Sequence, residues 1–190
     1  MCADSQNLSE HWNEKSLGSL AEHIVETHHV FCRQEVVRIA ALFKEVIDKH
    51  GKDHPELKRL QTLFFKMSRD LSMHLLKEEQ TLFPYIVRVE EAVNGKTPVS
   101  WPPFGTVRNP IRIMVLEHDQ TDREMEEIRQ LSKHYTPPAD SCERYAALYD
   151  SLAAFDRDMQ QHIDIENNLL FPRAVALEEE ACAGQKVSER

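Results

Sequence analysis

The chain has 190 residues, which is enough for one generous domain with little left for a second. Hydrophobic residues make up 41 % of it and charged residues 29 %, a globular composition that excludes a disordered or membrane-embedded chain. The 23 basic and 32 acidic residues give a formal net charge of −9, which argues against nucleic acid and anionic membranes as partners.

Few turn-forming residues are present, only 5 glycines and 9 prolines, and this favours long helices over an all-β fold. Residues 1–17 are polar and predict a loose leader. Ser19 stands three residues before Glu22, the spacing of a helix capping box, and an amphipathic pattern follows to about His50. Gly51 is expected to end this first helix in the left-handed conformation.

A second helix is predicted from Asp53 to about Ala92. Asp53 is a candidate N-cap, and Pro55 suits the first turn because the N–H that proline lacks has no partner there. Residues 94–108 hold three prolines and two glycines. This stretch therefore predicts a long connection rather than a helix.

The third helix is predicted to begin at the Asn-Pro pair of residues 109–110 and to end near His134. The following TPPADS segment breaks the helical pattern. Asp140 or Ser141 is then expected to cap a fourth helix that runs to about Glu180.

Two short connections and one long one join these helices, and short links place consecutive helices antiparallel. The sequence therefore predicts an all-α fold, an up-down-up-down four-helix bundle over residues 18–180, with a C-terminal tail at 181–190. Pro84 and Pro172 are expected to kink the second and fourth helices.

An internal repeat relates the two halves of the chain. HLLKEEQTLFP at 74–84 and HIDIENNLLFP at 162–172 both place Glu four residues after His and both end in Leu-Phe-Pro. We interpret the chain as two copies of a helix pair, 1–93 and 94–190, which predicts a bundle with an internal pseudo-twofold axis.

Each half contributes two histidines and one glutamate to the apolar stripes of its helices. Six residues share these inward positions: His29, His74, Glu78, His118, His162 and Glu166. A buried ionised carboxylate costs several kcal/mol unless a cation compensates it, and no Lys or Arg lies on these stripes. A single buried histidine is more often a hydrogen-bonded core residue, but four in register with a repeat predict a metal site.

Four His and two Glu are too many ligands for one tetrahedral zinc ion, whereas they suit two six-coordinate ions. Imidazole and carboxylate without thiolate favour two non-haem iron ions joined by an oxo or hydroxo bridge, with manganese and zinc as the alternatives. We expect one ion to take His29 and His74 and the other His118 and His162, with Glu78 and Glu166 as bridges.

Four stretches carry a family resemblance across residues 18–178: LAEHIVETHH, HLLKEEQTLFP, LEHD and HIDIENNLLFPRA. The sequence resembles the hemerythrin-like family, and within it the bacterial repair-of-iron-centres di-iron proteins. The resemblance implies the same six metal ligands. Oxygen-carrying hemerythrins have a fifth histidine where this chain has Asp122, and relatives often have a second first-helix histidine where it has Cys32. The cysteine-bearing N-terminal domain usual in repair proteins is not expected here.

The resemblance implies a di-iron stress-response protein that supplies iron for repairing iron–sulfur clusters damaged by nitric oxide or oxidative stress. Damaged iron–sulfur proteins would be its partners. One alternative is a non-haem di-iron oxidoreductase that reduces nitric oxide, nitrite or peroxide. Another is a sensor or storage module that binds O₂ or NO. The sequence singles out no catalytic residue, and the fold does not decide between these functions.

The four cysteines, Cys2, Cys32, Cys142 and Cys182, are far apart, which excludes a CxxC metal motif and a disulfide scaffold. The N-terminus has no signal-peptide pattern, and no run of 18 apolar residues could span a membrane. A cytoplasmic protein is therefore expected.

Several residues have both an ordinary and a functional interpretation. Cys32 is read first as a buried filler and second as a redox-active thiol. Asp122 either orients a ligand histidine or is a solvated helix residue. Trp101 and Phe104 are expected to pack over the open end of the bundle. Six histidines are interpreted as surface residues: His11, His23, His28, His50, His54 and His134.

Overall fold

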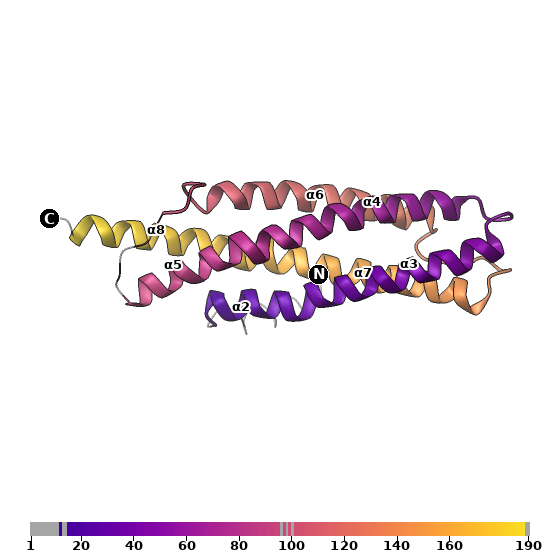
Figure 1. Ribbon diagram of the computed structural model, residues 1–190, viewed down its shortest axis with the longest axis horizontal. Coiled ribbons are helices and arrows are strands. Elements are labelled where there is room, and N and C mark those ends of the chain that lie inside the picture. Colours follow the sequence, from indigo (N-terminus) through magenta and orange to yellow (C-terminus); the bar gives the residue numbers. More distant parts are fainter. Residues whose placement is uncertain (1–11, 13–14, 96, 98, 100, 189–190) are drawn as a thin grey trace.

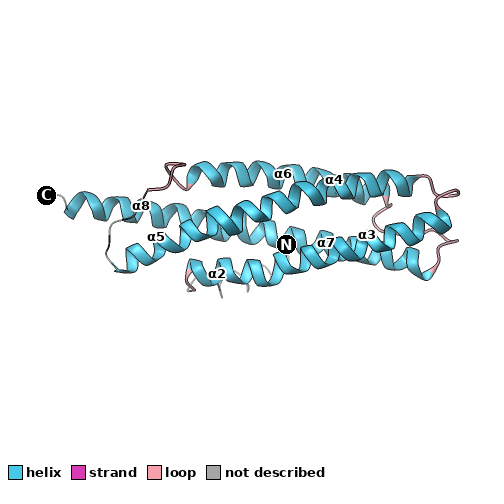
Figure 2. Ribbon diagram, in the orientation of Figure 1, coloured by secondary structure: helices cyan, strands magenta, loops and turns pink. Residues whose placement is uncertain are grey.

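The computed structural model describes residues 12, 15–95, 97, 99 and 101–188 (Figure 1). Four helical rods run alternately up and down, and loops occur only at their ends, as Figure 2 shows. The described residues contain helices and no strands, which confirms the all-α bundle. None of the described helices has the length and apolar character that a membrane crossing needs.

Three of the four rods are interrupted by a π-helical turn of five residues. The first rod consists of α2 (Leu17–Ile24), the π turn η1 (Val25–His29) and α3 (Val30–His50). The second consists of α4 (Glu56–Lys77), η2 (Glu78–Leu82) and α5 (Phe83–Gly95). The third is α6 (Arg108–Leu131) alone, and the fourth consists of α7 (Glu143–Ile165), η3 (Glu166–Leu170) and α8 (Phe171–Ser188).

The π turns η2 and η3 stand where a proline kink was predicted. Pro84 and Pro172 are each the second residue of the α-helix that follows the turn. Proline cannot donate to the helix and its ring crowds the carbonyl four residues earlier, so the wider turn before it relieves that conflict. Each of these two helices is therefore distorted by one extra residue in the turn before its proline. No proline accompanies η1, and nothing in the sequence indicated it.

The helix ends differ in detail from the predicted ones. Ser16 caps α2, with its hydroxyl accepting the Ser19 N–H at 3.0 Å, so the helix begins before the predicted capping box. The carboxylate of Glu90 on α5 accepts hydrogen bonds from the N–H groups of the first two residues of α2, Leu17 and Gly18, at 2.7 and 2.9 Å. A carboxylate at a helix N-terminus is stabilising because the free N–H groups and the helix dipole both favour it.

The other caps are made by backbone geometry rather than by the predicted side chains. Gly51 has φ −65°, a right-handed conformation, so its predicted left-handed stop is wrong. Pro55, Val107 and Cys142 occupy the N-cap positions of α4, α6 and α7, none with a side-chain cap bond. These positions replace the predicted caps at Asp53 and at Asp140 or Ser141. α8 extends to Ser188, into the segment that was assigned to a tail.

The turn between α6 and α7 contains three consecutive left-handed residues. Lys133, His134 and Tyr135 have φ of 50°, 56° and 59°, which non-glycine residues rarely adopt. The Tyr135 hydroxyl donates to the buried carboxylate of Asp156 at 2.8 Å. Arg129 donates to both oxygens of the same carboxylate at 2.9 Å. These bonds hold the turn, and α6 consequently ends at Leu131 rather than near His134.

The long connection closes the other end of the bundle through one buried carboxylate. Glu178 on α8 accepts from the Tyr85 hydroxyl at 2.6 Å, from the Val107 N–H at 2.8 Å and from the Thr106 hydroxyl. The Phe104 ring packs edge-on to Tyr85 with centroids 5.1 Å apart, as predicted for Phe104. The second predicted packing residue, Trp101, is instead 46 % exposed, because the connection turns it outward.

The hydrophobic core consists of two clusters. One lies among α3, α4, α6 and α7, and includes Phe43, Phe64 and Phe155. The other lies among α2, α5, α8, the first half of α6 and the long connection, and includes Tyr85 and Phe171. In each rod the chain passes from one cluster to the other at a buried polar position. This polar layer is where the candidate site lies.

Candidate metal centre

All six residues predicted to bind metal are buried at the same level of the bundle. His29 ends η1, and Glu78 and Glu166 begin η2 and η3. His74, His118 and His162 lie in α4, α6 and α7. The exposed fraction is 0 % for both glutamates and at most 4 % for any of the four histidines. The internal repeat thus places one histidine from each rod around two carboxylates.

The six residues form two groups whose ligand atoms lie within 4.8 Å of one another. One group is His29, Glu78, His162 and Glu166, and the other is His74, Glu78, His118 and Glu166. Both glutamates belong to both groups, as expected for bridges. The predicted histidine pairs are wrong, however, because α3 packs along α7 and α4 along α6. Histidines from those neighbouring rods, rather than from the same half of the chain, share a position.

Each carboxylate spans the two groups with its two oxygens. Glu78 turns Oε2 toward His29 Nε2 at 3.5 Å and Oε1 toward His74 Nε2 at 3.2 Å. Glu166 turns Oε1 toward His162 Nε2 and Oε2 toward His118 Nε2, both at 3.1 Å. Each carboxylate could thus offer one oxygen to a cation in either group.

The buried polar atoms of the centre fit a metal because protein groups leave them unsatisfied. Within the described part of the chain, both oxygens of Glu78 and of Glu166, and the Nε2 atoms of His29 and His162, have no hydrogen-bond partner and almost no solvent contact. Leaving such atoms unpaired costs about 1–3 kcal/mol each, and more for charged groups. A cation at each position would satisfy imidazole nitrogen and carboxylate oxygen together.

The pKa shifts at the centre also indicate that a positive charge is favoured beside its carboxylates. Burial opposes the charged form of His162, but the Glu166 carboxylate outweighs it and raises the pKa of His162 well above its ordinary value. Burial likewise opposes protonation of His74, and Glu78 outweighs it and raises that pKa. Burial would raise the pKa of Glu166, whereas the charge of His162 holds it below its usual range. The two carboxylates therefore attract positive charge into a dry interior.

Three of the four imidazoles are oriented by a hydrogen bond from Nδ1. His29 donates to Glu79 at 2.7 Å and His74 to Glu117 at 2.9 Å. His118 donates to the amide oxygen of Asn167 at 3.0 Å. A carboxylate or amide oxygen only accepts, so Nδ1 carries the proton and Nε2 turns its lone pair to the centre.

The sequence did not predict these outer partners. Each sits next to a candidate ligand in the chain: Glu79 follows Glu78, Asn167 follows Glu166, and Glu117 precedes His118. A neighbouring helical residue points about 100° away and looks solvent-facing in a periodicity argument. The one available signal was the matching place of Glu79 and Asn167 in the two repeats.

The fourth imidazole, His162, has different surroundings. His28, predicted to be a surface residue, is only 4 % exposed and stacks on His162 with ring centroids 5.5 Å apart. Its Nδ1 bonds Asp158 at 2.9 Å, so helix packing rather than sequence pattern buries it. Cys32 is 1 % exposed, as expected for a filler, and burial raises the pKa of its thiol, an effect that the neighbouring His162 partly offsets.

Asp122 is an exposed helix residue, in line with the ordinary interpretation. His118 Nδ1 bonds Asn167 and its Nε2 faces His74 Nε2, so neither ring nitrogen is paired with Asp122. Burial of part of its carboxyl group raises the pKa of Asp122.

The other predicted surface histidines divide into three kinds. His134 is exposed, as predicted, and His11 lies outside the described residues. His23, His50 and His54 are half-buried rather than at the surface, because each packs against another aromatic ring.

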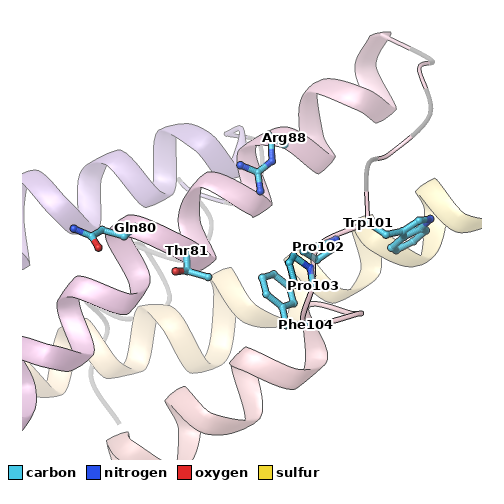
Figure 3. A pocket seen from close by; sticks show the side chains of 7 residues that line it. All are labelled: Gln80, Thr81, Arg88, Trp101, Pro102, Pro103 and Phe104. Atoms are coloured by element: carbon cyan, nitrogen blue, oxygen red, sulfur yellow. The ribbon is translucent and has the colours of Figure 1, made fainter.

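Two surface pockets lie near the polar layer. A pocket of about 690 Å³ has Gln80, Thr81 and Arg88 on one side and the connection from Trp101 to Phe104 on the other (Figure 3). A second pocket, of about 730 Å³, lies between α2 and α5, and Glu79 and Phe83 line it. Since Glu79 is hydrogen-bonded to His29, the second pocket reaches the outer edge of the candidate centre.

Comparison with known proteins agrees with this geometry. Residues 20–174 match the family model described as the hemerythrin HHE cation binding domain. The chain is 32 % identical over 171 residues to a probable iron-sulfur cluster repair protein of Haemophilus influenzae, covering 90 % of this chain and 71 % of the relative. It is 32 % and 31 % identical to the iron-sulfur cluster repair proteins YtfE of Yersinia pseudotuberculosis and Yersinia pestis, covering 88 % of this chain and 70 % of each relative. The chain therefore belongs to the hemerythrin HHE cation-binding domain family.

Proposed function

We propose that this chain holds two iron ions and supplies iron for the repair of iron–sulfur clusters damaged by nitric oxide or oxidative stress. The observation that carries the proposal is the pair of buried carboxylates whose four oxygens each face a different imidazole. The names of the relatives, iron-sulfur cluster repair proteins, supply the expected target. Damaged iron–sulfur proteins are accordingly the proposed partners.

The residues divide into two ligand sets of two imidazoles and two carboxylate oxygens. One set contains His29 and His162, and the other His74 and His118, with Glu78 and Glu166 shared. Four protein atoms for each ion leave further positions open when the ion prefers six. Imidazole and carboxylate ligands without a thiolate suit iron, and manganese or zinc would be the competitors.

A modest negative charge at the centre supports release rather than permanent storage. Two divalent ions bring four positive charges, whereas Glu78 and Glu166 supply two negative ones. The imidazoles are neutral donors, so the protein's direct ligands neutralise only part of the charge of the two ions, and this weakens the hold of the centre on both. A carboxylate-rich cage would bind the same ions more tightly.

The proposal is tested by metal content and by transfer. Anaerobically reconstituted protein should hold about two irons per chain and restore the cluster of an apo-ferredoxin supplied with sulfide. The double substitution His74→Ala and His162→Ala should abolish both properties, whereas His134→Ala, at an exposed site, should change neither. A fully folded chain that takes up no iron, or a loaded chain that transfers none, contradicts the proposal.

A second candidate function follows from the same open positions. They would let the centre bind nitric oxide, O₂ or peroxide, either for reduction or as a sensor. Sustained consumption of nitric oxide or peroxide with a reductant, at undiminished iron content, would favour the oxidoreductase. Reversible binding without consumption would favour the sensor.

A further inference from the structure

The outer hydrogen bonds of the centre follow the internal repeat at one pair of positions. Glu79 directly follows Glu78 and bonds His29, and Asn167 directly follows Glu166 and bonds His118. The two halves of the chain thus orient their first histidines, in the first and third rods, in the same way. Each metal position receives one histidine oriented by this contact.

The repeat is broken at the other pair of positions. Glu117 directly precedes His118 and bonds His74. Its counterpart, directly preceding His29, is His28. His28 turns its Nδ1 to Asp158 and lays its ring flat against His162, with an interplanar angle of 4°. The place that a carboxylate fills beside His74 is therefore filled by a stacked ring beside His162.

His162 is left without an oxygen partner for its Nδ1. That atom is fully buried and has no oxygen or nitrogen hydrogen-bond partner among the described residues, and the only side-chain contact of this kind to the ring besides Glu166 is the Cys32 thiol. The thiol of Cys32 is the polar group beside the ring, and a thiol is a weak donor and a weak acceptor. The position of His74 and His118 thus has two oriented imidazoles, whereas that of His29 and His162 has one.

We infer that the two metal positions are unequal, and that the ion held by His29 and His162 leaves first. An outer hydrogen bond fixes the tautomer and direction of a ligand imidazole and makes its nitrogen a better donor, and losing it costs about 10–100-fold in metal affinity. The inference rests on the proposed function for the presence of two ions. It adds which ion is the one donated.

A surface pocket lies on the side of His29. The pocket between α2 and α5 is lined by Glu79, which bonds His29, and by Phe83, whose ring stacks on His29 with centroids 5.8 Å apart. Glu22 and Glu26 also line it, so with Glu79 three carboxylates and the guanidinium of Arg88 surround this pocket. The pocket thus borders the residues that orient and cover His29, while His29 itself is fully buried.

Release kinetics of the iron-loaded full chain test the inference. An excess of ferrous chelator should withdraw one iron in a fast phase and one in a slow phase, with rates about 10–100-fold apart. Loss of one ion also disturbs the shared carboxylates, so the variants decide which position empties first. Asn167→Ala removes the partner of His118 and should accelerate only the slow phase, about tenfold or more.

Two further variants complete the test. Asn168→Ala changes the neighbouring residue of the same π turn, which bonds Asp164 at 2.7 Å and not a histidine, and should leave both phases unchanged. Cys32→Asp places a carboxylate beside His162 and should slow the fast phase, with circular dichroism as the check on folding. A single phase for both irons in the unaltered chain, or an Asn167→Ala effect on the fast phase, overturns the inference. Unequal release without transfer to an apo-ferredoxin would reject the proposed function alone, and transfer with equal release would reject the inference alone.

Discussion

The Nε2 atoms of His74 and His118 face each other at 3.1 Å, although the two histidines come from different halves of the repeat. With Nδ1 of each bonded to an oxygen, both Nε2 lone pairs point at the same place. Two lone pairs at that distance repel unless a proton or a metal ion lies with them. The centre is thus formed by both helix pairs together, and neither half contains it alone.

Metal binding should stabilise the fold, because it satisfies buried atoms that the protein leaves unpaired. At a free metal concentration of 100 times Kd, the free energy of unfolding should rise by about 2.7 kcal/mol for each site. Thermal unfolding followed by circular dichroism, with and without Fe²⁺ under anaerobic conditions, measures this. The double variant Glu78→Gln and Glu166→Gln should fold without metal but lose the metal-dependent shift. A shift of equal size in that variant would contradict the assignment of the two bridges.

The buried carboxylate of Asp156 should contribute more to the free energy of unfolding than the exposed carboxylate of Glu126 does. It accepts hydrogen bonds from Arg129 and Tyr135 while 4 % exposed, and Asp156→Ala would leave both partners without it. We expect a loss of about 3 kcal/mol in the free energy of unfolding, measured by urea denaturation. Glu126→Ala is the matched control, because Glu126 also pairs with Arg129 but at the surface, and it should lower the free energy of unfolding far less than Asp156→Ala does. Equal losses for the two variants would be inconsistent with this role.

Replacing His134 with glycine should stabilise the protein, whereas glycine inside a helix of the bundle should destabilise it. His134 is exposed and has φ 56°, and the left-handed conformation costs a residue with a side chain about 1–2 kcal/mol. His134→Gly should therefore raise the free energy of unfolding by about 1 kcal/mol. Lys44→Gly, at an exposed position of α3, should lower it by about 0.7 kcal/mol. The opposite signs, obtained from urea denaturation, are the expected result.

The Cys142 thiol should be reactive near neutral pH. Its pKa is lowered to about 7, first by the hydrogen bond to His50 at 3.1 Å and then by backbone N–H groups at the start of α7 and the charge of Lys49. Because the thiolate is the nucleophile, alkylation by iodoacetamide should rise with pH and reach half its maximum rate near pH 7.

Substitution of the histidine partner tests the cause of that reactivity. His50→Ala should move the midpoint of alkylation toward the ordinary cysteine value of about 8.5 and slow the reaction at pH 7 about tenfold. Cys142→Ser identifies the background from other thiols, and Cys32, which is 1 % exposed, should stay unmodified in the folded protein. An unchanged midpoint in His50→Ala would show that the helix terminus alone sets the pKa.

Sequence periodicity predicted the four rods and the six central residues because both depend on which face of a helix is apolar. His29 and Glu78 could be placed on inward stripes without knowing which helices are neighbours. The pairing of His29 with His162 could not, since it depends on α3 packing along α7. The burial of His28 likewise depends on the fourth rod, which supplies both Asp158 and the ring of His162.

The π turns were beyond a periodicity argument for a different reason. Such an argument assumes 3.6 residues per turn throughout. The wider π turns η2 and η3 depart from this period, and they begin at Glu78 and Glu166 themselves. The Leu-Phe-Pro signature marked both positions, but a proline alone does not distinguish a kink from an inserted residue. Turn conformations such as that of His134 are set by Asp156 from another helix, and local sequence does not show them.

The division of the core by a polar layer has a consequence for how the protein opens. Two hydrophobic clusters lie on either side of Glu78, Glu166 and their histidines, and we expect them to open as two cooperative units in the metal-free chain. Bound ions would link all four rods at the junction between these units and couple their unfolding. Amide hydrogen exchange should then show the two ends protected to different degrees in the metal-free chain and to a common degree in the loaded one. Loss of bound metal would thus make the protein more flexible at its middle while each end keeps its packing.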